Sequence, residues 1–131
     1  MTSTAKGTFE VKIDPVEDNH PTPPGRMLLD KQSHGDLQAT SLGQMLTALT
    51  AVPQSGGYVA VEQVSGTLHG RSGTFMLQHN GFMNRGEQSL TITVVPDSGT
   101  GELVGLAGEM AIHFEGEQHL YELTYTLADA L

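Results

Sequence analysis

The stretch VVPDSGTGELVGLAG, residues 94–108, decides the fold of this sequence. Pro96 and Asp97 are typical of a turn, and the glycines that follow them can adopt the positive φ that other residues resist. Gly105 and Gly108 are expected inside the next strand, where glycine usually marks a bulge or a barrel corner. The stretch therefore predicts a sheet that bends sharply enough to close on itself.

Segments that alternate between polar and apolar residues lie on both sides of this stretch and predict about eight strands. Residues 42–49 are also compatible with a short helical turn, and the pattern alone leaves that choice open. Residues 14–25 contain four prolines and are expected to form an extended surface loop. The predicted strands cover residues 8–13, 27–33, 37–45, 58–68, 74–80, 88–95, 102–114 and 119–127.

The connections between these segments are short, which is typical of an antiparallel all-β meander. Closure of about eight strands into a barrel is favoured because it removes exposed strand edges, and a two-sheet sandwich is the alternative. With 131 residues, the chain is expected to form a single β-barrel domain over residues 1–131.

The charge of the sequence argues against several partners. The formal net charge is −9, and no Lys or Arg follows Arg85. Such a surface repels phosphate backbones and anionic lipid, so we expect no nucleic-acid partner and no membrane partner. The chain has no cysteine, no apolar run of membrane-spanning length and no signal-peptide pattern at residues 1–6. These features predict a soluble cytoplasmic protein.

Six histidines raise the question of a metal site. His113 and Glu115 share a strand face, and His119 follows across a hairpin, but there is no H-x-H pair and no H-E-x-x-H helix. A solvated hairpin is the simpler interpretation. We therefore expect neither a metal nor another cofactor.

Five segments carry a resemblance to a known family: residues 58–62, 66–75, 78–79, 96–108 and 119–125. They resemble an uncharacterised bacterial domain-of-unknown-function family, whose members are similar to the small barrels of allene oxide cyclases. The Ser-Gly-Thr-Gly…Gly-x-x-Gly pattern is also similar to that of plant allene oxide cyclases and dirigent proteins. The resemblance covers residues 26–127 and implies an allene oxide cyclase-like barrel. Such barrels often associate, so the resemblance also admits a homo-oligomer.

The same resemblance implies little about activity, because the bacterial family has none assigned. The cyclases bind a fatty-acid-derived epoxide in the barrel and steer its ring closure. Their pocket cysteine has no counterpart in this chain, which contains no cysteine. A shared barrel does not imply a shared reaction.

Two polar residues on otherwise apolar faces are the candidate catalytic acid–base groups. His79 continues the face of Phe75, and an imidazole there could exchange a proton near neutral pH. Glu62 lies in a strand whose pattern is typical of burial on both faces, where desolvation is expected to raise the pKa of its carboxyl. The alternatives are a histidine bonded to backbone or water, and a rim carboxylate paired with Arg71 or Lys31.

Five further residues are candidates for ligand contacts. Tyrosine hydroxyls on an inner face could bind a polar group of a ligand, although large aromatic residues on such faces usually belong to the core. Tyr58 and Gln63 are the weaker candidates because they lie on opposite faces of one strand. The candidate ligand-binding residues are Tyr58, Gln63, Phe75, Tyr121 and Tyr125.

Three functions are compatible with such a barrel. The first is binding of an apolar or amphipathic small molecule in a pocket open at one end. The second is a cyclase or isomerase that holds a flexible substrate while Glu62 or His79 moves a proton. The third is a filled barrel that acts as a structural or interaction module. A ligand-sized cavity is expected for the first two functions and a solidly packed interior for the third.

Overall fold

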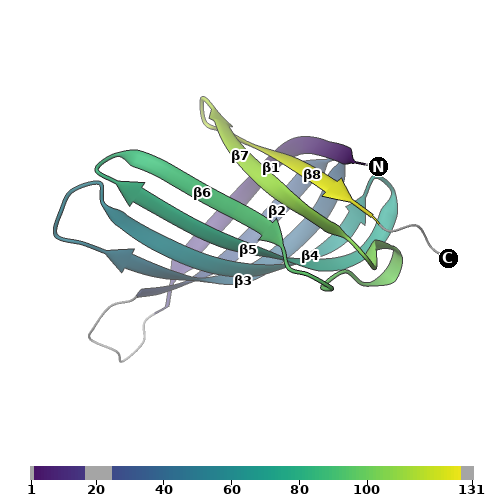
Figure 1. Cartoon of the computed structure of the whole chain (residues 1–131), viewed down its shortest axis with the longest axis horizontal. Helices are drawn as coiled ribbons and strands as arrows, with labels where there is room; N and C mark the ends of the chain where they lie inside the picture. Colours follow the sequence, from purple (N-terminus) through teal and green to yellow (C-terminus); the bar gives the residue numbers. More distant parts are fainter. Residues whose placement is uncertain (1, 17–24, 128–131) are drawn as a thin grey trace.

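The computed structural model describes residues 2–16 and 25–127, which form eight strands and one short 3₁₀ helix. Each strand pairs antiparallel with the next and β8 pairs with β1, so the sheet closes into a barrel (Figure 1). The predicted all-β meander and its closure are confirmed, and the sandwich alternative is wrong. The elements are β1 (Ser3–Pro15), β2 (Gly25–Gly35), β3 (Leu37–Leu49), β4 (Gly56–Leu68), β5 (Arg71–Asn84), β6 (Glu87–Val94), η1 (Gly101–Leu103), β7 (Ala107–Glu115) and β8 (Gln118–Thr126).

Two further points concern the predicted proline-rich loop and membrane-spanning helices. Residues 17–24 of the proline-rich loop predicted over residues 14–25 lie outside the described residues, whereas Asp14 and Pro15 belong to β1 and Gly25 to β2, so the prediction is wrong at both ends of this range. Within the described ranges, no helix is long and apolar enough to cross a membrane.

Alternation of side chains determines which face of each strand is buried. In β3, Leu37, Ala39 and Ser41 are buried, whereas the residues between them are exposed. This strand runs to Leu49 and pairs with β4 along its whole length, so the helical alternative for residues 42–49 is wrong. Backbone hydrogen bonds to β4 outweigh the weak local preference of this segment.

The glycine-rich stretch differs from its prediction. Gly101–Leu103 form the 3₁₀ helix η1, and β7 begins only after this turn. Leu103 and Leu106 are almost completely buried in the core, so the turn is held by apolar packing as well as by its glycines. Of the two glycines expected inside the next strand, Gly108 lies in β7, whereas Gly105 has a φ of 86° and lies in the preceding turn.

Side chains fill the barrel over most of its length. Inward-facing residues such as Phe9, Leu77, Ile92 and Leu123 form one core. The cavity among them measures about 10 Å³ and lies beside Glu62, which leaves room for about one water molecule. A ligand-sized hollow in the middle of the barrel is therefore ruled out. Room for a ligand lies at the end where the β3–β4 and β5–β6 hairpins project, which we call the mouth (Figure 1).

Candidate functional site

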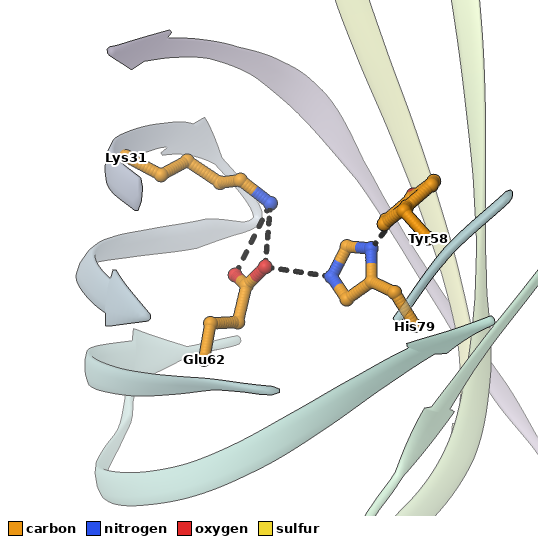
Figure 2. Close-up of polar contacts among 4 residues, drawn as sticks. All are labelled: Lys31, Tyr58, Glu62 and His79. Atoms are coloured by element: carbon orange, nitrogen blue, oxygen red, sulfur yellow. Dashed lines mark hydrogen bonds and ion pairs between the residues drawn. The ribbon is translucent and has the colours of Figure 1, made fainter. Parts of the chain in front are cut away.

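Four polar side chains below the mouth form a continuous series of contacts (Figure 2). The Lys31 Nζ lies 3.1 and 2.9 Å from the two carboxylate oxygens of Glu62. The His79 Nε2 lies 2.7 Å from Oε2 of Glu62, and its Nδ1 lies 3.3 Å from the Tyr58 hydroxyl. We call these residues the polar relay. Three of its four members, all but Lys31, were predicted as site residues.

The register of β4 and β5 explains how Glu62, His79 and Tyr58 meet. Tyr58 and Glu62 lie four residues apart on the inward face of β4. His79 of β5 pairs directly with Ala60, which lies between them on the same face. Because the Ala60 side chain is small, the imidazole can span the space above it and contact both neighbours.

Lys31 reaches Glu62 across an intervening strand. It lies in β2, and β3 separates it from β4. Gly43 of β3 pairs with Glu62, and a Cβ at this position would lie 2.6 Å from the Val61 carbonyl oxygen and 2.8 Å from the Glu62 Cα. The missing side chain at Gly43 therefore allows β3 and β4 to approach closely beside Glu62. The Lys31 Nζ also lies 5.0 Å from the centroid of the Phe9 ring.

Glu62 is ionised in the folded protein. Its side chain is 1% exposed, and burial by itself would raise the pKa of the carboxyl. The hydrogen bond with His79 and the positive charge of Lys31 outweigh burial and lower this pKa to about 2. The expectation of a raised pKa is therefore wrong. Pairing with Lys31 is correct, but the pair is buried and does not lie at the rim.

The ionised carboxylate fixes one hydrogen bond of the imidazole. Because a carboxylate only accepts, Nε2 of His79 donates to Glu62, and Nδ1 shares a second hydrogen bond with the Tyr58 hydroxyl. Burial and the negative charge of Glu62 raise the pKa of Tyr58. Tyr58 therefore stays a protonated phenol at neutral pH, and Glu62 holds its partners in place rather than accepting a proton itself.

A pocket of about 630 Å³ occupies the mouth, and we call it the mouth pocket. Its wall is mostly apolar and includes Met45, Leu49, Leu90 and Phe114. Tyr58 is the member of the polar relay that lines this pocket, and the other three are buried behind it. A hollow of about 840 Å³ adjoins the mouth pocket and shares Phe82 and Met83 with it, and one of about 650 Å³ lies beside Pro96 and Leu106; neither contacts any of the four residues. A molecule in the mouth pocket would thus meet the Tyr58 phenol.

Lys31 and the apolar residues of the mouth were not predicted as site residues, although the sequence contains a signal for each. Lys31 shares a strand face with Met27 and Leu29, and a lysine on an apolar face indicates a buried charge that needs a partner. Leu90 lies on the same inward face of the predicted strand 88–95 as Ile92 and Val94, but it is partly exposed, whereas they are buried in the core.

Two predicted tyrosines bind other parts of the protein. The Tyr121 hydroxyl accepts a hydrogen bond from the Leu37 N–H (2.8 Å) and donates one to the His34 carbonyl (2.9 Å). The Tyr125 hydroxyl lies 2.5 Å from Nδ1 of His69. Both side chains are buried away from the mouth pocket, so they tie loops to the core.

Phe75 and Gln63 also lie apart from the mouth pocket. Phe75 is 1% exposed and belongs to the core. Gln63 is exposed on the outer face of β4, between the inward-facing Glu62 and Val64, so it does not contact the interior.

The histidines considered for metal binding have other surroundings. In residues 2–16 and 25–127, no group of three or more His, Asp or Glu side chains is placed to hold a metal ion. The His119 ring centroid lies 5.1 Å from that of Phe9 and 5.0 Å from that of Phe114. This imidazole therefore packs in an aromatic cluster.

Comparisons with known proteins identify a family but no activity. The family model described as "Protein of unknown function (DUF3224)" matches residues 5–125. The crystal structure of a protein of unknown function from this family in Shewanella oneidensis MR-1 is 47% identical in sequence, with a TM-score of 0.94 over 99% of this chain and 100% of that chain. No curated protein matches the sequence significantly. The resemblance to an uncharacterised bacterial family is confirmed, and the chain belongs to the DUF3224 family.

Proposed function

We propose that this protein binds a small amphipathic molecule in the mouth pocket. The observation that carries the proposal is the position of Tyr58, whose hydroxyl joins the buried relay to a mostly apolar pocket of about 630 Å³. Pockets that bind metabolites combine apolar walls with a few placed polar groups. The apolar part of the ligand would contact the wall, and its polar group would bond to the phenol.

Tyr58 favours an uncharged polar group on the ligand. Its raised pKa keeps the phenol protonated, so the hydroxyl can donate one hydrogen bond and accept another; one of the two joins it to His79, and the other is left for the ligand. Lys31 is matched by Glu62 at 2.9 Å, which leaves no excess positive charge behind the phenol. The net charge of −9 further disfavours an anion. An alcohol or an amide, which can donate as well as accept, therefore fits this pocket better than a carboxylate.

A cyclase or isomerase is the second candidate function, favoured by the contacts of His79 with both a carboxylate and a phenol. In that case Tyr58 touches the substrate and His79 exchanges a proton with the phenol. Glu62 is then a positioning residue and not the base suggested by the sequence, because its pKa of about 2 makes it a weak base. If no small molecule binds in the mouth pocket, the filled interior favours the third function, a structural or interaction module.

The test uses the intact protein and a neutral fluorescent probe, N-phenyl-1-naphthylamine, which is displaced by 1-decanol, decanoate or decylamine. We expect 1-decanol to bind at least about tenfold more tightly than decanoate. Tyr58→Phe should weaken 1-decanol binding by about three- to tenfold, the equivalent of one hydrogen bond. Tyr125→Phe is the matched control, because it removes a phenol that lies outside the mouth pocket.

Two results would overturn the proposal. One is the absence of probe binding. The other is probe binding that persists in Leu90→Asp, which places a charge in the pocket wall. If Tyr58→Phe and Tyr125→Phe weaken 1-decanol binding equally, Tyr58 is not the residue that bonds to the polar group of the ligand.

Two expectations from the sequence accompany this proposal and stay predictions. Light scattering on purified protein tests whether the chain forms a homo-oligomer. Fractionation of the producing cell tests its cytoplasmic location.

A further inference from the structure

The seam between β6 and β7 has the shortest ladder of backbone pairs in the barrel wall described here. It pairs Ile92 with Met110 and Thr93 with Glu109, and no further. Both strands are paired along their other edges, β6 with β5 and β7 with β8. Residues 87–91 of β6 and 111–115 of β7 therefore face each other without a ladder, and we call this gap the slot. Figure 1 shows the two strands diverging from their short contact toward the mouth.

The slot is continuous with the mouth pocket. Leu90 of β6 and Phe114 of β7 flank the slot, and both line the pocket. Leu90 is 43% exposed and Phe114 is 65% exposed, so the two edges present apolar surface that the protein itself does not cover. Ile112, partly buried against the core, lies on the same strand closer to the paired end.

Widening this seam costs less than widening its neighbours. Separation of β5 from β6 would break a ladder from Leu77–Val94 to Asn84–Glu87, at about 1 kcal/mol for each hydrogen bond. The unpaired part of the slot has no such bonds to lose. The weakest part of the barrel wall thus lies against the pocket that the proposed ligand occupies.

We infer that the ligand is a single-chain amphiphile whose apolar chain passes sideways through the slot, between Leu90 and Phe114. This inference rests on the proposed function, because it assumes that the polar group of the ligand bonds to Tyr58. A narrow unbranched chain fits between two strand edges, whereas a compact ring system stays within the mouth. The slot edges carry Glu87 and Glu115, and no Lys or Arg follows Arg85 in the sequence. The end of the ligand's apolar chain that emerges from the slot is therefore not anionic.

A disulfide across the slot tests this inference in a chain that has no other cysteine. Thr91→Cys with Ala111→Cys places the bond at the first unpaired position. Thr93→Cys with Glu109→Cys is the matched control, because these residues already pair. Each oxidised and reduced form is titrated with 1-decanol and with compact 1-adamantanol, both displacing N-phenyl-1-naphthylamine. Leu90→Trp fills the slot without a cross-link and serves as a second variant.

We expect the disulfide at 91 and 111 to weaken 1-decanol binding at least about tenfold, the loss of two buried methylenes, and reduction to restore it. Leu90→Trp should weaken 1-decanol binding in the same way. Binding of 1-adamantanol should change less than about twofold between the oxidised and reduced forms of both cysteine pairs. Equal 1-decanol affinities with the slot open and closed, or equal losses for both alcohols, would overturn the slot inference and leave the proposed function standing. If neither alcohol binds the wild type, the proposed function itself fails.

Discussion

Replacing Glu62 by glutamine removes the negative charge on which the polar relay depends. The Glu62 side chain is 1% exposed and is held by Lys31 and His79. A pKa lowered from 4.5 to about 2 corresponds to about 3 kcal/mol of folding free energy at neutral pH. In the variant, Lys31 also stays buried without a counter-charge. We therefore expect Glu62→Gln to lower the free energy of unfolding by about 3–5 kcal/mol at pH 7.

The size of this loss depends on pH in one direction. Because the pKa of Glu62 is lower in the folded protein than in the unfolded chain, its stabilising contribution is complete above pH 4.5 and is lost as the pH falls toward 2. The wild type should lose about 3 kcal/mol across this window that Glu62→Gln does not lose. The unfolding free energies of the two proteins should therefore approach each other as the pH falls.

Urea unfolding at a series of pH values measures the effect. The chain has no tryptophan, so far-UV circular dichroism reports unfolding better than fluorescence. Glu10→Gln is the matched control, because Glu10 lies 2.7 Å from His34 but its side chain is 72% exposed. We expect a much smaller change there. A difference between wild type and Glu62→Gln that stays constant from pH 7 to about pH 2.5 would refute the assignment of Glu62 as a buried, ionised group.

The same unfolding assay checks three more predictions. Lys31→Met combined with Glu62→Leu should be more stable than Glu62→Gln by at least about 2 kcal/mol, because no charge is left unpaired; a double variant less stable than Glu62→Gln would contradict this. Gly43→Ala should cost about 2 kcal/mol or more, because its Cβ would meet backbone at 2.6 Å, and a neutral effect would show that β3 can move. His69 has a φ of 47°, so His69→Asn should lose about 1 kcal/mol with the bond to Tyr125, and His69→Ala about 1 kcal/mol more. Equal losses in the two His69 variants would argue against backbone strain there.

The sequence predicts the barrel and part of the site because both depend on the period of two residues along a strand. This period places Tyr58 and Glu62 on one face of β4 and turns His79 inward, as the structure confirms. The direction of the pKa shift at Glu62 could not be predicted in this way, because it depends on the hydrogen bond with His79 and on the charge of Lys31, which lies two strands away.

The filled interior and the slot were beyond sequence reasoning for a different reason. Whether a closed barrel is hollow depends on the fit between side-chain volumes and the barrel radius, which alternation does not encode. Phe75 is core in a barrel of this size and would line a cavity in a wider one. The β6–β7 ladder stops at Ile92–Met110 although both strands continue toward the mouth, and alternation along each strand does not show where two strands separate.

The buried charges of Lys31 and Glu62 lie behind the phenol of Tyr58, which lines the mouth pocket. Apolar side chains at positions 31 and 62 would fill the same space, and such replacements are often neutral or stabilising. They would not supply an oriented phenol, because Glu62 holds the imidazole of His79 and raises the pKa of Tyr58. Both effects act on Tyr58, the member of the polar relay that lines the mouth pocket. A stable Lys31→Met, Glu62→Leu protein that no longer prefers 1-decanol over decanoate would link the ion pair to binding, whereas an unchanged preference would assign the pair to the fold alone.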